Sequence, residues 1–101
     1  MARIVVEYSF EKPMSDEELS VIAQRLDPCL DVRNGTWARS YVAGDRRRMT
    51  CEFEAPDAES VREALRSANV TFERVWPANV FDAADYPEFQ AKLEKLRGKK
   101  G

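Results

Sequence analysis

Residues 36–57 read TWARSYVAGDRRRMTCEFEAPD, and this stretch decides the fold. Side chains alternate over 36–43 and again over 48–55 with the period of two that is typical of half-buried β-strands. A Gly-Asp turn at 44–46 separates the two runs, and this combination indicates a β-hairpin. The sequence therefore predicts two antiparallel strands at the centre of the chain.

The same alternation assigns the side chains of the hairpin to two faces. One face of the second strand is apolar and is expected to pack against helices: Met49, Cys51, Phe53 and Ala55. The opposite face is expected to carry three residues of each strand: Ala38, Ser40, Val42, Thr50, Glu52 and Glu54. The other residues of the first strand either form a wall of a ligand site or cover the core: Trp37, Arg39 and Tyr41.

The chain before the hairpin is predicted to form a strand and an amphipathic helix. Alternation over residues 3–10 indicates the strand. Ser15 and Glu18 form a capping box, and apolar residues follow at helical spacing over residues 16–26. Pro28 is expected to end this helix, because proline lacks the amide hydrogen that would continue it.

The chain after the hairpin is predicted to add a helix, a strand and a further helix. Asp57 is expected to cap the second helix, and Asn69 is expected to end it in the left-handed conformation. Residues 72–81 are predicted to form the fourth strand. Pro77 places that strand at a sheet edge, because proline has no amide hydrogen to donate to a neighbour. A third helix is expected over residues 85–97.

The predicted order, βαββαβ with a C-terminal helix, is that of a ferredoxin-like α+β sandwich. Right-handed crossovers and a central hairpin give an antiparallel sheet with strands in the spatial order 4-1-3-2. The fourth strand lies at an edge in this order, in agreement with Pro77. We expect a single domain over residues 1–101, with its core over 2–82 and the helix over 85–97 added.

The composition limits the classes of function. Sixteen Lys and Arg oppose 18 Asp and Glu, and the net charge of −2 argues against nucleic-acid binding. No apolar run is long enough to span a membrane, and no signal peptide is evident, so we expect a cytoplasmic protein with reduced cysteines. The absence of histidine argues against zinc. Carboxylates on the third strand argue against an RNA-recognition module, which carries aromatic residues there.

The polar sheet face carries the candidate site. The candidate ligand-binding residues are Glu7, Ser9, Arg39, Ser40, Tyr41 and Glu52. Neighbouring carboxylates such as Glu7 and Glu52 can serve as acid and base or hold a hard cation. Arginine and aromatic planes can stack on a flat substrate. The alternative is an ordinary solvated sheet face. Trp76 is interpreted as a core or interface residue.

Five short motifs, which cover most of the chain up to Phe81, carry a family resemblance: Val6-Glu7, Trp37-x-x-Ser40-Tyr41-Val42, Cys51-x-Phe53-Glu54-Ala55-Pro56-Asp57, Val61-Arg62 and Arg74-Val75. They resemble a bacterial domain-of-unknown-function family of small ferredoxin-like proteins that is often described as nickel-binding. The resemblance implies a dimeric α+β barrel in which two sheets enclose a cavity. The nickel description depends on histidines, which this chain lacks, so no metal and no cofactor is predicted.

Three hypotheses for the function remain. The first is a homodimer that binds a small molecule in a cavity on the polar sheet face. The second is a cofactor-free enzyme on the same scaffold, of the oxygenase, cyclase or isomerase type. The third is a regulatory domain that associates with another protein. The sequence contains no nucleophile–base pair, glycine-rich phosphate loop or metal-ligand cluster, so the first hypothesis is favoured.

Overall fold

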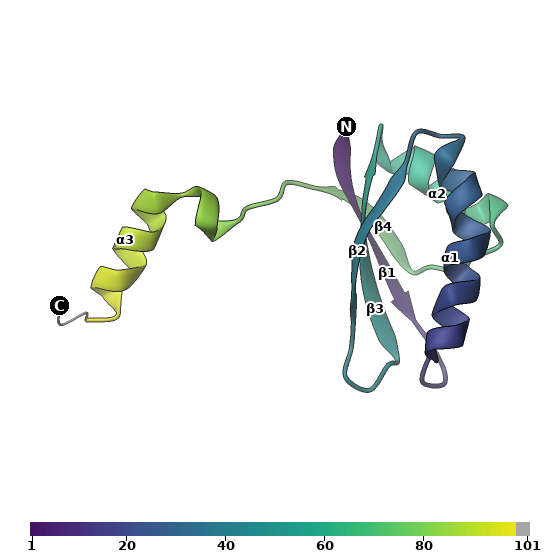
Figure 1. The fold of residues 1–101 in the computed structure, drawn as a ribbon, viewed down its shortest axis with the longest axis horizontal. Coiled ribbons are helices and arrows are strands. Elements are labelled where there is room, and N and C mark those ends of the chain that lie inside the picture. The colour runs from purple at the N-terminus through teal and green to yellow at the C-terminus, as the bar shows by residue number, and fades with distance from the viewer. Residues whose placement is uncertain (99–101) are drawn as a thin grey trace.

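The computed structural model describes residues 1–98 and has the predicted order of strands and helices (Figure 1). The elements are β1 (Ala2–Ser9), α1 (Asp16–Asp31), β2 (Thr36–Val42), β3 (Arg48–Ala55), α2 (Ala58–Ser67), β4 (Arg74–Ala78), the 3-10 helix η1 (Ala83–Asp85) and α3 (Pro87–Leu96). The predicted domain runs to residue 101, and residues 99–101 lie outside the described part of the chain.

The strands form one antiparallel sheet in the order β2-β3-β1-β4, which confirms the predicted order. β4 lies at an edge, where Pro77 pairs with Ile4 of β1 on one side only. A proline at this position leaves no ladder hydrogen bond unmade on the open side. The edge position expected from Pro77 and the strand order expected from right-handed crossovers therefore agree.

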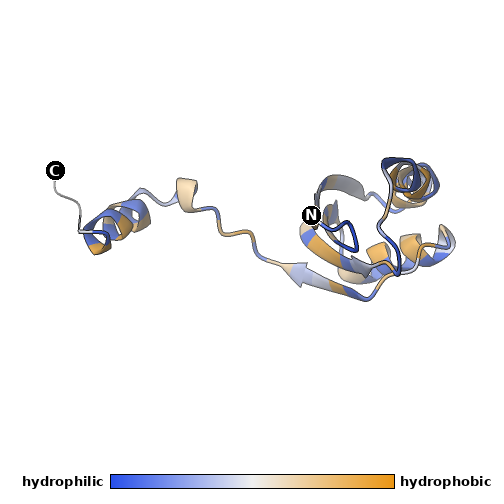
Figure 2. Ribbon diagram, turned by 90° about the horizontal axis from the view of Figure 1, so that it is seen from below, coloured by the Kyte–Doolittle hydropathy of each residue, from blue (hydrophilic) through white to orange (hydrophobic). Residues whose placement is uncertain are grey.

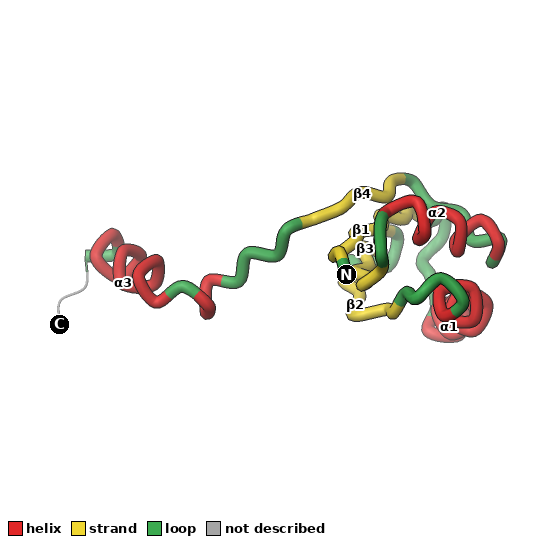
Figure 3. The backbone as a smooth tube through the Cα atoms, turned by 90° about the horizontal axis from the view of Figure 1, so that it is seen from above, coloured by secondary structure: helices red, strands yellow, loops and turns green. Residues whose placement is uncertain are grey.

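Helices α1 and α2 cover one face of the sheet, and no helix of residues 1–98 packs on the other face (Figures 1 and 3). Figure 2 shows apolar segments in the sheet and in the helices that pack against it. The largest fully buried side chains all belong to this layer: Ile4, Val6, Tyr8, Leu26, Leu30, Met49, Cys51, Phe53, Val61 and Leu65. The predicted helix-facing set is thus confirmed. We call the uncovered side the free face.

Helix α1 does not end before Pro28, so the predicted end at residue 26 is wrong. The helix continues to Asp31 with Pro28 inside it. The extra turn buries Leu30 beside Leu26, four residues earlier on the same side of the helix. Burying a leucine contributes about 1.5–3 kcal/mol, which offsets much of the roughly 3 kcal/mol cost of an interior proline.

The caps of the helices agree with the prediction, whereas the ends of the last elements differ. Ser15 and Glu18 form the capping box, and Asp57 accepts a hydrogen bond from the amide of Ser60. Asn69 has a φ of 58° and ends α2 in the left-handed conformation. β4 is confined to Arg74–Ala78, shorter than the predicted 72–81, and α3 begins at Pro87 instead of residue 85. No helix within residues 1–98 combines the length and the apolar character of a membrane span.

Strand β2 contains an irregularity at Ala38 that reverses the predicted faces of its second half. Trp37 pairs with Phe53, but the next paired residue, Arg39, lies opposite Glu52. Between these two pairs, β2 contains one extra residue, Ala38, that has no partner in β3, as in a β-bulge. After the bulge, Ser40 and Val42 lie on the helix-covered face, and Arg39 and Tyr41 lie on the free face. The predicted shared face of Trp37 with Arg39 and Tyr41 is wrong.

Candidate functional site

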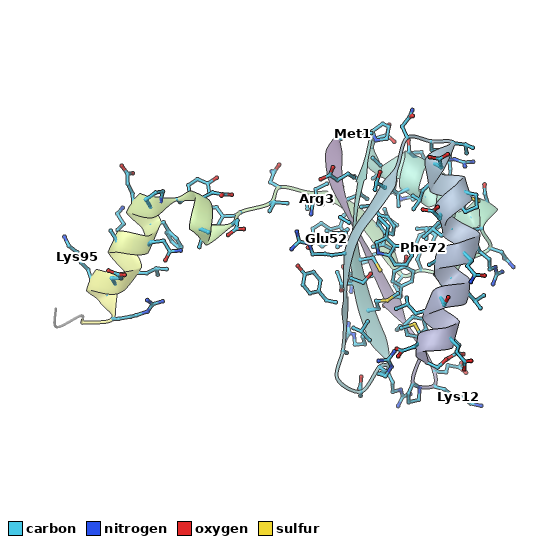
Figure 4. The ribbon with its side chains drawn as sticks, in the orientation of Figure 1. Met1, Arg3, Lys12, Glu52, Phe72 and Lys95 are labelled. Carbon is cyan, nitrogen blue, oxygen red and sulfur yellow. The ribbon has the colours of Figure 1, made fainter. Side chains whose placement is uncertain are left out.

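A hollow of about 490 Å³ lies on the free face, and we call it the free-face hollow. Its lining comes from all four strands and from the segment after β4: Arg3, Val5, Arg39, Tyr41, Glu52, Trp76, Ala78, Asn79, Val80, Phe81, Asp82 and Ala83. Arg3 and Glu52 project from the sheet on the side away from α1, whereas Phe72 projects toward the helix layer (Figure 4). The predicted residues Arg39, Tyr41 and Glu52 meet here.

Glu52 is the centre of a network of ion pairs in this hollow. Its Oε1 atom accepts a hydrogen bond of 2.7 Å from Arg3 and lies 3.4 Å from Nε of Arg39. Arg3 also donates to Glu54 at 2.9 Å. The Nε–H of Arg3 is buried and has no hydrogen-bond partner within residues 1–98. The network therefore leaves one donor unsatisfied inside the protein, where it is a local energetic cost.

Arginine and aromatic side chains surround this network and remain partly open to solvent. The side chain of Arg39 is 61% exposed, and Tyr41 and Trp76 are 54% and 42% exposed. Val5, only 7% exposed, lies between Glu52 and Trp76 in the sheet register. The site thus combines an apolar floor, two aromatic rings and an available guanidinium group.

Glu7 belongs to a different group of side chains. It accepts a hydrogen bond of 2.7 Å from the indole Nε1 of Trp76, and its other carboxylate oxygen lies 3.6 Å from Nε of Arg74. Glu52, by contrast, pairs with Arg3 and Arg39. Glu7 and Glu52 are two register positions apart on adjacent strands, and each pairs with its own cation. Their use as acid and base stays a prediction. Glu7 fixes the ring of Trp76 at the edge of the free-face hollow.

Ser9 does not line the free-face hollow either. Its hydroxyl donates to Glu73 at 2.6 Å, and the residue lines another hollow, of about 590 Å³, along α1. The apolar part of that α1 groove consists of Phe10, Met14, Val21 and Ile22, with charged residues of both signs around it. The groove is larger than the free-face hollow, but no network of convergent polar groups lies within it. We therefore take the free face as the candidate site.

Ser40 is part of the helix-covered layer, and its prediction as a residue of the polar face is wrong. Its hydroxyl accepts a hydrogen bond of 2.8 Å from the indole of Trp37 and lies 2.9 Å from the thiol sulfur of Cys51. Trp37 in turn packs on Phe53, with ring centroids 5.4 Å apart. Trp37 therefore covers the core, and Ser40 satisfies the polar atoms beneath it.

Cys51 and Tyr8 are titratable groups in the core, and burial raises the pKa of both. Desolvation raises the pKa of Cys51 to about 11, although its hydrogen bond with Ser40 and the nearby hydroxyl of Tyr8 act in the opposite direction. Desolvation also raises the pKa of Tyr8 far above its ordinary value, with the neighbouring Cys51 adding to the effect. A protonated, fully buried thiol is a poor nucleophile, which agrees with the predicted packing role of Cys51.

Nine residues that line the free-face hollow were not predicted as site residues from the sequence: Arg3, Val5, Trp76, Ala78 and residues 79–83. Arg3 and Val5 share the alternation of Glu7, so their positions on the free face were available from the sequence. Trp76 alternates with the buried Val75 in the same way. Residues 79–81 were predicted to continue the fourth strand, so no pattern in the sequence indicated that residues 79–83 line the hollow.

Comparisons with known proteins bear on the family and on the fold. A family model described as "Nickel responsive protein SCO4226-like" matches residues 5–77. The chain is similar to the crystal structure of SCO4226 from Streptomyces coelicolor A3(2), with a TM-score of 0.72 and 14% sequence identity over 80% of this chain and 100% of that one. No curated protein sequence matches the chain. The structural likeness confirms the ferredoxin-like α+β fold.

The side chains of residues 1–98 do not fit a nickel site. They contain no group of three or more His, Cys, Asp or Glu residues that could hold a metal ion. Nickel prefers imidazole or thiolate ligands, the whole sequence has no histidine, and Cys51 lies in the helix-covered core. Glu52 is already paired with two arginines. A second copy of the chain would bring no imidazole either.

Proposed function

This chain belongs to the SCO4226-like family, and from that premise we propose that it binds a small organic molecule as a homodimer. The ligand lies in the free-face hollow, and the second copy closes the site. The proposal rests on one observation above all: an exposed arginine and two aromatic rings meet around Glu52 in a hollow of about 490 Å³. Volumes of about 300–1,000 Å³ are usual for small-molecule sites.

The residues of the hollow favour a flat molecule that carries an anionic group. Tyr41 and Trp76 offer ring faces on which a planar molecule can stack. The guanidinium of Arg39 can pair with a carboxylate or sulfonate. Glu52 keeps the side chains of Arg3 and Arg39 oriented toward the hollow. The ligand is thus recognised by stacking and by charge together.

The proposal of a homodimer is supported by the apolar surface of the free face. Tyr41 and Trp76 are large aromatic residues that would remain half exposed in a monomer. An uncovered sheet face with such residues is a common protein contact surface. A second copy placed against this face would also exclude water from the hollow and strengthen the pairing of Arg39 with an anion.

A dye that combines aromatic rings with a sulfonate tests the proposed site without knowledge of the natural ligand. We expect anilinonaphthalene sulfonate to bind the full chain with increased fluorescence. Arg39→Gln should weaken this binding by about tenfold, since it removes a charge-assisted hydrogen bond. Arg25→Gln is the matched control, because Arg25 lines the α1 groove instead. Equal effects of the two substitutions, or a larger effect of Arg25→Gln, would refute the proposed site.

A further inference from the structure

The C-terminal part of the chain, residues 79–96, leaves the sheet as an extended arm (Figures 1 and 3). We call this segment the arm. The radius of gyration of the described chain is 17.1 Å, compared with about 13 Å for a compact domain of this length. The family match ends at residue 77, so the arm lies beyond the part that defines the family. The family match therefore does not indicate the role of the arm.

The arm carries an apolar surface that the rest of residues 1–98 leaves exposed. The rings of Phe81 and Tyr86 stack with centroids 4.6 Å apart, and Phe89 meets Phe81 edge to face at 5.3 Å. All three rings remain more than one-third exposed, and Leu96 on α3 is 82% exposed. Of the ten exposed large hydrophobic residues of the described chain, five lie in the arm, which makes it the main uncovered apolar surface.

Helix α3 needs a surface to pack on. It has ten residues and none of them is buried. Isolated helices of fewer than about 12 residues are marginal in water, and their stability comes from packing of an apolar side. Phe89, Leu93 and Leu96 recur at i, i+4 and i+7 and provide such a side. We therefore expect the apolar side of α3 to pack on another surface.

The arm cannot easily supply that contact to its own sheet. It leaves β4 beside the start of β1, where Ala78 pairs with Arg3, and continues outward from the sheet. The chain makes no reversal between β4 and η1, and no residue from 79 to 97 has the positive φ that would favour a sharp return. The base of the arm already lines one end of the free-face hollow.

A second copy offers an apolar surface on which the arm can pack. A hollow of about 590 Å³ surrounds the aromatic cluster of the arm, and the free face presents the protruding rings of Tyr41 and Trp76. The first half of the arm is acidic, with Asp82, Asp85 and Glu88. The arginines of the free face are balanced by carboxylates, Arg3 and Arg39 by Glu52 and Glu54, and Arg74 by Glu7, so the contact rests on apolar rings. Two copies can make this contact reciprocally about a twofold axis, so that the assembly closes.

We propose that the arm of a second copy lies across the free face and closes the free-face hollow. The aromatic cluster Phe81, Tyr86 and Phe89 packs on Tyr41 and Trp76 of the other copy, and the ligand lies beneath it. Each site is then incomplete without the partner. This inference rests on the proposed dimer, but it does not depend on which small molecule binds.

The contribution of the arm to the dimer can be measured with a matched pair of variants. Phe89→Glu places a charge on the apolar side of α3, whereas Ala91→Glu places the same charge on the opposite, exposed side. In sedimentation equilibrium, Phe89→Glu should raise the dimer dissociation constant about tenfold or more, and Ala91→Glu should change it less than about threefold. A dimer unaffected by Phe89→Glu overturns the arm contact alone, whereas a monomeric unmodified chain overturns the proposed dimer as well.

The location of the arm is tested by photocrosslinking between two copies. A light chain carries benzoylphenylalanine in place of Phe89 and is mixed with an isotopically heavy, unmodified chain. We expect crosslinks from the light arm to heavy peptides that contain Tyr41 or Trp76. Crosslinks that stay within the light chain, that reach α1 of the heavy chain, or that fail to form overturn the inference. This readout needs no ligand, so it remains informative if the ligand proposal fails.

Discussion

The Nε atom of Arg39 lies 3.4 Å from Oε1 of Glu52, and the two residues are paired across the β2–β3 hairpin. Trp37, only two positions before Arg39, lies on the opposite side of the sheet. The bulge at Ala38 is responsible, because one extra residue moves every later side chain of β2 to the other face. The candidate site exists because this irregularity turns Arg39 and Tyr41 toward the free face.

The first prediction concerns the coupling of Arg39 and Glu52. Arg39→Gln and Glu52→Gln should each weaken dye binding, and the double variant should lose less than the sum of the two effects. Groups in one ion-pair network usually show interaction energies of about 0.5–3 kcal/mol in such a cycle. Titration of the four proteins by fluorescence gives the coupling energy. Glu59→Gln on α2 is the control for the loss of a surface carboxylate, and strictly additive effects at Arg39 and Glu52 would count against a shared site.

The second prediction concerns the start of α1. The hydroxyl of Ser15 accepts from the amide of Glu18 at 3.0 Å, and the carboxylate of Glu18 accepts from the amide of Ser15 at 2.8 Å. Ser15→Ala should lower the free energy of unfolding by about 0.5–2 kcal/mol. Ser20→Ala within the same helix should change it by a few tenths at most. Urea denaturation of both variants measures the two losses. Equal losses would show that removal of any serine hydroxyl from α1 lowers the stability and would contradict a specific role of the cap.

The third prediction is a loss of stability at alkaline pH. Burial raises the pKa of Cys51 from 9.0 to about 11, so the unfolded chain releases this proton at a lower pH than the native protein. The free energy of unfolding should therefore be insensitive to Cys51 below pH 9 and fall above it, by at most about 1.4 kcal/mol per pH unit until pH 11. Tyr8, whose pKa is also raised, should add to the fall at higher pH.

Urea denaturation at pH values from 8 to 10 measures this loss. Cys51→Ala should remove the part of the decline that begins near pH 9, although it lowers stability at neutral pH by leaving a small cavity. Cys29→Ala is the matched control and should keep the decline. A Cys51→Ala variant with the same pH dependence as the unmodified protein would show that another group is responsible.

The fourth prediction concerns nickel. The sequence has no imidazole, its one fully buried thiol lies in the core, and Glu52 is paired with arginines. We therefore expect no stoichiometric binding of nickel in the submicromolar range. Calorimetry must use protein without a histidine tag, since a tag would bind the metal itself. Tight, saturable nickel binding by the untagged chain would show that ligands other than those considered form a site.

The sequence predicted the fold well because its strongest signals are local and agree with one another. The capping box at Ser15, the alternation of β1 and β3 and the edge position of Pro77 each follow from backbone chemistry. The error at Pro28 arose because tertiary burial of Leu30 outweighs a local helix-breaking preference.

The site was predicted only in part, because it depends on non-local geometry. Arg39, Tyr41 and Glu52 were identified, but the bulge at Ala38 leaves no clear mark in a sequence that alternates through it. Ser40 was therefore assigned to the wrong face. Glu7 and Glu52 pair with different arginines, and side-chain pairing of this kind cannot be deduced from strand order alone.

Native mass spectrometry of freshly isolated, untagged protein tests the central proposal most directly. The account predicts a species of two 11.6 kDa chains that carries the additional mass of a small organic molecule. Arg39→Gln should lose that additional mass, and Arg25→Gln should retain it. Single 11.6 kDa chains without added mass, at every concentration examined, would contradict the account.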